Sequence, residues 1–389
     1  MNKTIGHNAL ALCIALLASA SHADVKVGFL ATLSGPSADV GRDQLDGFNL
    51  ALEQLGGKLG GAPAVLFKED DQQKPEVALD ALSKLLDKEK VDVVTGLTFA
   101  NIMMALQNKI AATDVPFLGS VAGVSAAAGA QCKPNLFVTS WQSDVPAEAM
   151  GKYLTDKGIK RISVMTPNFV GGKDKIAGLK RFYKGEIVDE VYTPLNQLDF
   201  SAELTRLGAS RPEAVFAFYP GGLGVTFVRQ YQQAGLQGKI PLYTTNTVEG
   251  TSVAAMGRAA FGVITADAWS PGSPGAESRQ FVAAFEKKYA RMPSAYAAFS
   301  YDAAMVLDAA LARRKGDASD RKALARAIAT TPFKSVRGAF RFGANNFPIQ
   351  NYHVFEIAKG AADKAEFRLL AENVLQSHAD AYASKCIAK

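Results

Sequence analysis

Short apolar runs alternate along the chain with stretches in which apolar residues recur every three or four positions. Residues 25–30 form the first apolar run, and helical spacing then appears in Leu45, Phe48, Leu52 and Leu55. A short run of this kind predicts a buried strand, and the spacing that follows predicts a helix with one buried face. Repetition of the two patterns in this order is typical of parallel sheets covered by helices on both faces.

The alternation occurs in two successive series. The first predicts strands at residues 25–30, 64–67, 91–94, 117–118 and 136–138, and it spans roughly a hundred residues, an ordinary domain size. The second predicts strands at residues 162–165, 187–192, 214–218, 241–244 and 263–266. We therefore expect an α/β chain with two doubly wound lobes.

The pattern becomes helical after residue 274 and ends in a strand-rich piece. Phe281, Phe285 and Tyr289 share one helical face, and residues 339–342 and 352–357 are predicted strands. Long helices without strands of their own cannot bury their apolar faces, so this stretch is expected to pack on the first lobe. Because ligands bind beyond the carboxyl ends of parallel strands, two facing lobes predict one cleft.

The first 23 residues have the pattern of a secretory signal. Lys3 precedes an apolar run at residues 10–17, and small residues surround the expected cleavage site after Ala23. Cleavage would leave 366 of 389 residues, a length that favours two domains. An uncleaved amphipathic anchor is the alternative. We expect an exported protein that folds in water, because no later run approaches about 18 apolar residues.

Charge and cysteine usage fit an exported protein that does not bind nucleic acid. The formal charge is +6, but Lys and Arg alternate with Asp and Glu, as at residues 68–71, which indicates a mixed solvated surface. Cys13 lies in the signal, so Cys132 and Cys386 remain in an oxidising compartment. A disulfide that ties the C-terminal tail to the body is predicted, with two free thiols as the alternative.

Residues suited to catalysis are sparse. His7 and His22 lie in the signal, which leaves His353 and His378, and no phosphate-binding loop is present. A histidine metal cluster or catalytic triad is thereby disfavoured. His353 stands in an alternating strand pattern and is expected to be an ordinary strand residue. We expect no metal, no cofactor and no reaction. An exported hydrolase with a carboxylate pair is the alternative that motifs do not exclude.

Short motifs occur in order along the chain, at residues 25–29, 33–36, 41, 46–47, 93–96 and 116–120, and a further one at residues 302–304 lies in the returning helical stretch. Their order and spacing resemble those of the branched-chain amino acid type of periplasmic binding protein, across essentially the whole mature chain. The resemblance implies two Rossmann-like lobes that close on a ligand about three hinge crossovers, near residues 139–144, 268–273 and 345–350.

The same resemblance implies a domain division and a partner. The first lobe would comprise residues 24–141 and 271–346, and the second would comprise residues 142–270 and 347–389. The protein is expected to be a periplasmic monomer that delivers its ligand to the membrane permease of an ABC uptake system. A branched-chain amino acid or amide receptor and an extracytoplasmic ligand sensor are the alternatives within this fold.

Departures from the amino acid pattern bear on the ligand. Where such binders hold the ligand carboxylate with a pair of hydroxyl groups, this chain has residues 98–101, in which Phe99 and Ala100 replace polar by apolar surface before Asn101. Asn246 occupies the place of the acidic residue that meets the ligand ammonium, and loss of that counter-charge costs about 2–5 kcal/mol. An amino acid ligand is therefore disfavoured. A carboxylate could still bind backbone amides and a hydroxyl in the loop with Ser120, Ala122 and Gly123.

Aromatic residues are frequent in the same loops, and they complete the set of candidate ligand-binding residues: Phe99, Trp141, Phe169, Tyr219, Trp269 and Tyr301. Planar apolar walls favour an aromatic acid. Residues 96–101 and 139–144 also resemble family members that take up benzoate-like and lignin-derived carboxylates. Arg42 is a candidate partner of the carboxylate. Core packing is the alternative for each ring, and an exposed surface position is the alternative for Arg42.

Overall fold

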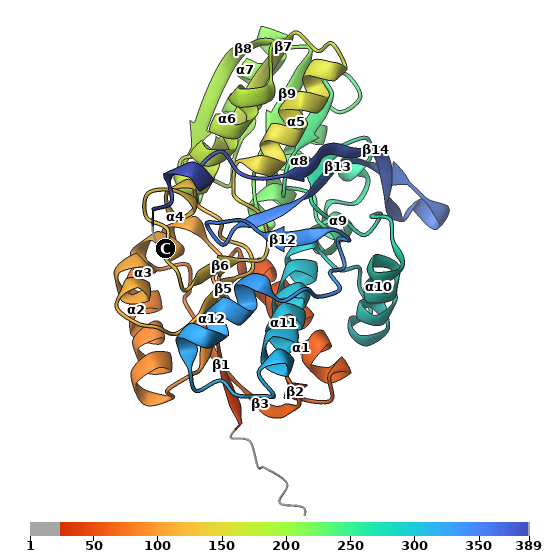
Figure 1. Ribbon diagram of the computed structural model, residues 1–389. Helices are drawn as coiled ribbons and strands as arrows, with labels where there is room; N and C mark the ends of the chain where they lie inside the picture. Colours follow the sequence, from red (N-terminus) through yellow and green to blue (C-terminus); the bar gives the residue numbers. More distant parts are fainter. Residues whose placement is uncertain (1–23, 388–389) are drawn as a thin grey trace, which may run out of the picture.

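The computed structural model describes residues 24–387 and contains two α/β lobes, each built on one mainly parallel sheet (Figure 1). This arrangement confirms the predicted fold class. The expected signal, residues 1–23, lies outside the described residues. No helix within residues 24–387 has the length and apolar composition needed to cross a membrane.

The first sheet has the strand order β2-β3-β1-β4-β5-β6. Its strands are β1 (Val25–Ala31), β2 (Lys58–Leu59), β3 (Ala62–Asp70), β4 (Val93–Gly96), β5 (Phe117–Gly119) and β6 (Leu136–Val138). The helices between them are α1 (Ala38–Gln54), α2 (Pro75–Ser83) with a π-helical turn (Lys84–Lys88), α3 (Ala100–Ala111) and α4 (Ser125–Ala128).

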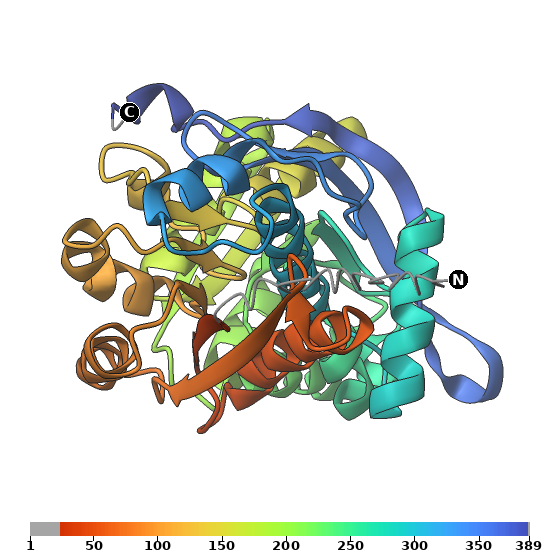
Figure 2. The same ribbon diagram turned by 60° about the horizontal axis from the view of Figure 1, so that its bottom comes forward.

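Strand β1 separates two apolar cores in the first lobe. Val27 and Phe29 pack on the face covered by α1 and the returning helices α11 (Ala295–Arg313) and α12 (Arg321–Thr330). Leu30 packs on the opposite face, against α2 and α3. Helix α11 lies along α1 and so packs on the first lobe, as expected for this stretch (Figure 1 and Figure 2). Both faces of this parallel sheet are thus buried, as such sheets require.

The second sheet has the order β12-β13-β11-β10-β9-β7-β8, and β14 pairs with β13. Its strands are β7 (Arg161–Pro167), β8 (Glu186–Thr193), β9 (Ala214–Ala217), β10 (Leu242–Thr244), β11 (Ile264–Asp267), β12 (Phe340–Phe342), β13 (Pro348–Lys359) and β14 (Ala365–His378). The remaining α-helices are α5 (Val145–Asp156), α6 (Val170–Phe182), α7 (Ser201–Ser210), α8 (Gly222–Gln233), α9 (Gly250–Met256) and α10 (Ala276–Tyr289).

The hairpin of β12 and β13 belongs to both lobes. Its strands pair with each other in the second sheet, whereas Phe347 at its turn is buried in the core of the first lobe. The backbone oxygen of Asn346 also accepts a hydrogen bond from the nitrogen of Val138 in β6. The domain boundary expected between residues 346 and 347 therefore passes through this turn, and β12 pairs with the second sheet instead of the first.

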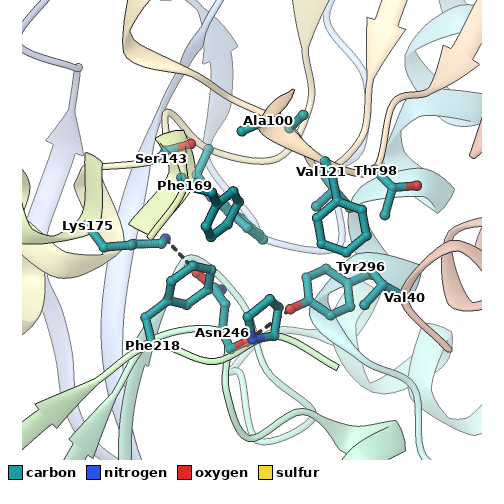
Figure 3. Close-up of a pocket in the computed structure, with 15 residues that line it drawn as sticks. Val40, Thr98, Ala100, Val121, Ser143, Phe169, Lys175, Phe218, Asn246 and Tyr296 are labelled. Atoms are coloured by element: carbon teal, nitrogen blue, oxygen red, sulfur yellow. Dashed lines mark hydrogen bonds between the residues drawn. The ribbon is translucent and has the colours of Figure 1, made fainter. Parts of the chain in front are cut away.

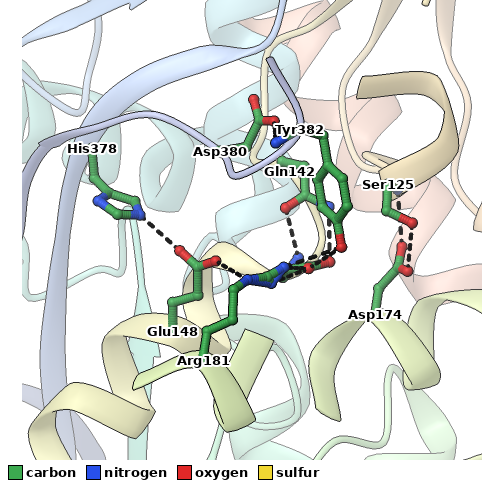
Figure 4. A network of polar contacts seen from close by, with 9 residues as sticks. Ser125, Gln142, Glu148, Asp174, Arg181, His378, Asp380 and Tyr382 are labelled. Carbon is green, nitrogen blue, oxygen red and sulfur yellow. Dashed lines mark hydrogen bonds and ion pairs between the residues drawn. The ribbon is translucent and has the colours of Figure 1, made fainter. Parts of the chain in front are cut away.

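The C-terminal tail forms an additional link between the lobes. It follows β14 of the second sheet, and Cys386 is bonded to Cys132, which precedes β6 of the first lobe. The predicted disulfide is thereby confirmed. Figure 4 shows the polar contacts of this tail, in which the Tyr382 hydroxyl donates to Asp144 over 2.7 Å and Glu148 lies 2.7 Å from His378. The tail is held by both covalent and polar contacts.

Replacement of both Cys132 and Cys386 by alanine is expected to lower the free energy of unfolding by about 2–4 kcal/mol. The bridge joins residues 254 positions apart, so its loss releases a long loop in the unfolded chain. Urea unfolding of oxidised wild type and the double variant tests this. Reduced wild type is the matched control and should unfold with the variant. An unchanged midpoint in both would contradict a stabilising disulfide.

Candidate ligand-binding site

A cavity that is partly open to solvent lies between the two lobes (Figure 3). The first lobe and the crossover after β6 contribute Val40, Thr98, Phe99, Ala100, Val121, Ala122, Tyr296, Trp141 and Ser143. The second lobe contributes Phe169, Gly171, Lys175, Phe218, Pro220 and Asn246.

Strand ends and helix starts build the cavity. Phe99 and Ala100 connect β4 to α3, Phe169 and Gly171 stand where β7 leads into α6, and Pro220 precedes α8. The cavity therefore lies at the carboxyl ends of the parallel strands, as the fold predicts. The amino ends of helices carry partial positive charge, so this arrangement favours an anionic group.

Five of the fifteen lining residues are aromatic, namely Phe99, Trp141, Phe169, Phe218 and Tyr296. Phe169 and Phe218 stack with centroids 6.2 Å apart and an interplanar angle of 23°. Trp141 also lines the cavity, and its ring centroid lies 6.2 Å from that of Tyr296. Figure 3 shows Phe169, Phe218 and Tyr296 around one space. Such rings can stack on a planar apolar ligand or meet it edge to face.

Lys175 is the one charged side chain among the fifteen lining residues that the structure describes. It is 2 % exposed, and its Nζ donates a 2.7 Å hydrogen bond to Oδ1 of Asn246. The same nitrogen lies 5.2 Å from the ring centroid of Trp141 and 5.4 Å from that of Phe218. Burial lowers the pKa of Lys175 to about 7, and the nearby Asp267 opposes this shift in part.

Two buried carboxyl groups lie behind Asn246. The Asn246 amide nitrogen donates to Asp267, and Asp267 also accepts a 2.6 Å bond from the nitrogen of Ala268. Glu249 accepts a 3.0 Å bond from the backbone nitrogen of Ala295 in the first lobe. Burial raises the pKa of Asp267 to about 7 and the pKa of Glu249 well above its usual value. Neither acid is among the residues that line the cavity.

Hydrogen bonds between the lobes surround the cavity. Ser125 of α4 donates to Asp174 of α6 through its backbone nitrogen and hydroxyl, at 3.0 and 2.8 Å. The Tyr296 hydroxyl of α11 donates to the backbone oxygen of Asn246 over 3.0 Å. Thr251 of α9 donates to a carboxylate of α1. The described conformation is therefore one in which the lobes are in contact.

Six of the thirteen candidate residues line the cavity: Phe99, Ala100, Ala122, Trp141, Phe169 and Asn246. The polar candidates of the first lobe lie elsewhere. Arg42 is exposed, and its Nε donates to the backbone oxygen of Leu33. Ser120 is buried behind the wall and accepts a 2.8 Å bond from Gln44. Asn101 lies in the first turn of α3 but does not line the cavity.

Close packing accounts for the other four candidates. Gly123 lies against the crossover, where an added Cβ would come 1.8 Å from the backbone oxygen of Trp141. Tyr219 stacks on Phe227 in the core of the second lobe. The indole nitrogen of Trp269 donates to Ser278, and the Tyr301 hydroxyl donates to Gln54. None of these four residues lines the cavity.

Nine lining residues were not among the candidates, and Lys175 is the most consequential of them. The others are Val40, Thr98, Val121, Ser143, Gly171, Phe218, Pro220 and Tyr296. The sequence does contain an indication for Lys175. Gly171 lies in the first turn of α6, and Lys175 follows it four positions later, one turn along the same helix. Residues with this spacing share a helix face, and helical side chains lean toward the amino end of the helix.

Comparisons with known proteins agree with this architecture. Residues 24–362 match the family described as periplasmic binding protein. A Leu/Ile/Val-binding protein homologue of Brucella melitensis is 28% identical over 289 residues, which cover 72% of this chain and 73% of that protein. Within residues 24–387, no group of three or more His, Cys, Asp or Glu side chains is arranged to hold a metal ion.

Two solved structures of ABC transporter solute-binding proteins are similar over nearly the whole chain. One, from R. palustris in complex with benzoate, is 30% identical with a TM-score of 0.88, covering 94% of this chain and 100% of that one. Another, from Rhodopseudomonas palustris BisB5 in complex with 3,4-dihydroxybenzoic acid, is 26% identical with a TM-score of 0.87, covering 92% and 99%. The chain therefore belongs to the periplasmic binding protein family and is of the solute-binding type found in ABC transporters.

Proposed function

We propose that this protein captures an aromatic carboxylate of the benzoate class in the periplasm, by closure of its two lobes. One observation carries the proposal: the cavity has aromatic walls and a single buried cation, Lys175, among its described lining residues. The complexes of similar proteins with benzoate and 3,4-dihydroxybenzoic acid support the same ligand class.

The ligand ring is placed among Trp141, Phe169 and Phe218, and its carboxylate is placed beside Lys175 and the amino end of α6. An ammonium–carboxylate contact in a water-excluded site is a charge-assisted hydrogen bond, one of the stronger polar contacts in proteins. The amino end of the helix adds partial positive charge. The cavity is thus complementary to a planar anion.

A branched-chain amino acid fits this cavity less well. Its ammonium group would bring a second positive charge close to Lys175, and buried like charges disfavour each other. The acids that could oppose that charge, Asp267 and Glu249, are separated from the cavity by Asn246. We therefore favour an aromatic monoanion over a zwitterion.

Membership of the family supports the rest of the proposal. Closure and opening of the lobes would carry the ligand to an ABC permease in the inner membrane, and the ligand would leave chemically unchanged. The Thr98 hydroxyl at the cavity donates to the amide oxygen of Gln44 over 2.7 Å, so it is not activated by a base. Binding without reaction is the activity that this cavity supports.

A thermal-shift and calorimetry screen tests the proposal. Benzoate, 4-hydroxybenzoate and 3,4-dihydroxybenzoate should bind, and a ligand at 100 times its Kd should add about 2.7 kcal/mol to the free energy of unfolding. Leucine and isoleucine are the competing ligands, and benzamide is the uncharged control. Tighter binding of leucine than of every aromatic acid would overturn the ligand assignment, and release of a chemically altered product would overturn the assignment as a binding protein.

A further inference from the structure

Three ionisable side chains form one buried cluster at the second-lobe wall of the cavity. Lys175, Asp267 and Glu249 are 2 %, 3 % and 6 % exposed. Asn246 joins two of them, since it accepts from Lys175 at 2.7 Å and donates to Asp267. Glu249 follows Asn246 by three residues, and its charge acts on both Lys175 and Tyr296. Of the three, only Lys175 reaches the cavity.

A count of charges limits the protonation states of this cluster. The ammonium group of Lys175 balances one of the two carboxylates, Asp267 or Glu249. The other acid is therefore stable in its buried position only in the protonated form. An arriving ligand carboxylate adds another negative charge beside Lys175. Two negative charges on one buried cation are costly, and a buried group commonly avoids that cost by taking up a proton.

From this juxtaposition we infer that the anionic ligand binds together with about one proton, which is held by Asp267 beside Glu249. The inference rests on the proposed function, because it requires a carboxylate next to Lys175. The step is balanced: a proton from solvent adds to a carboxylate oxygen of Asp267, the ligand carboxylate pairs with the Lys175 ammonium group, and no covalent bond breaks. Asp267 is a positioning residue, since it acts on the ligand through Asn246 and Lys175.

The other charged groups near the cluster do not supply a second positive charge that could balance the ligand carboxylate. Those that face the cluster or Tyr296 from neighbouring elements are Asp174, Arg337, Asp39 and Asp43. Three of them have partners, because Asp174 is bound by Ser125, Arg337 by Asp302 and Asp43 by Arg291. Burial raises the pKa of Asp39 on α1 to about 6, and this side chain adds negative charge when it is ionised. The proton therefore comes from solvent.

The direction of the pH effect follows from the pKa values. Burial holds the pKa of Lys175 and of Asp267 near 7 in the free protein. A bound carboxylate favours the protonated form of both groups, so the pair, which shares one proton in the free protein, holds two protons when the ligand is bound. Affinity is therefore full below about pH 7 and falls as the pH rises. Uptake of one proton corresponds to a tenfold loss of affinity per pH unit above that point, by linkage.

Calorimetry of wild type with benzoate tests the inference. Titrations at pH 7.5 in buffers of low and high ionisation enthalpy give the number of protons taken up, and titrations from pH 6 to 9 give the slope of affinity. We expect close to one proton, a tenfold loss per pH unit in the upper range, and no uptake with benzamide. A pH-independent affinity without proton uptake overturns the inference, while absence of benzoate binding at every pH overturns the proposed function instead.

Infrared difference spectra locate the proton. Benzoate should produce the carbonyl band of a protonated carboxyl group in wild type, and Asp267→Asn should lack it. Asp80→Asn, which changes an exposed carboxyl group on α2, is the matched control and should retain the band. Proton uptake without this band in wild type would place the proton on Lys175 and overturn the role of Asp267. The wild-type measurements stand even if the Asp267 variant does not fold.

Discussion

Lys175→Met is expected to weaken benzoate binding by about 2–5 kcal/mol, or roughly 30- to 4,000-fold, because truncation of one member of a buried charge pair has this cost. Methionine retains the length and apolar contacts of the side chain beside Trp141 and Phe218 but removes the ammonium group. Calorimetry at pH 7 with benzoate measures the loss. The affinity for benzamide, which carries no charge that could pair with Lys175, should differ little between wild type and the variant.

The matched control for this variant is Lys173→Met on the same helix. Lys173 is exposed on α6, so its replacement changes the net charge by the same amount without reaching the cavity. The affinity of the Lys173→Met variant for benzoate should stay within about a factor of two of the wild-type affinity. Equal affinities of the Lys175 and Lys173 variants would show that the ligand carboxylate lies elsewhere in the cleft, and would remove the electrostatic basis of the proposed function.

The fold was predictable because its strands are continuous apolar runs. Residues 25–30 and 162–165 fall inside β1 and β7, and both strands are buried on both faces. Strand β14 was not predicted because it lacks such a continuous apolar run. It pairs with β13 alone, so polar and apolar residues mix along Ala365–His378, and many of its side chains are exposed. A long antiparallel partner of this kind depends on tertiary pairing more than on a local pattern.

The cavity was predictable in its location and less so in its members. Trp141 and Trp269 both stand at crossovers, yet Trp141 lines the cavity, whereas Trp269 is fully buried and donates to Ser278. Tyr296 and Tyr301 differ in the same way, since five residues of helix turn the second ring to another face of α11. The sequence places an aromatic residue at a strand end or on a helix, but packing decides which side it faces.

Asn246 shows how a local departure can be recognised while its consequence is missed. The chain was expected to lack an acid at this place, and Asn246 does line the cavity. Two acids nevertheless lie behind it, and Lys175 of α6 donates to Asn246 from the cavity side. Because Lys175 and Asp267 are 71 and 21 positions from Asn246, only the folded chain brings their charges together.

Arg337 is the centre of a second buried ion pair, away from the cavity. Its guanidinium donates to Asp302 of α11 over 2.8 Å, and both side chains are at most 1 % exposed. Arg337 also donates to the backbone oxygen of Ser140 at 3.0 Å and to Gln350 of β13 at 2.6 Å. One side chain thus connects a first-lobe helix to the crossover after β6 and to the hairpin that belongs to both lobes.

Arg337→Met is therefore expected to lower the free energy of unfolding by about 3–5 kcal/mol, because it leaves Asp302 buried without its charge partner. Urea unfolding measures the loss. Asp302→Leu combined with Arg337→Met should be less destabilised than Arg337→Met alone, since apolar groups then replace both charges. Arg206→Met is the matched control, because Arg206 pairs with Asp189 at the surface and such a pair contributes about 1 kcal/mol or less. A loss for Arg337→Met no larger than that of the control would mean that the crossovers are held without this ion pair.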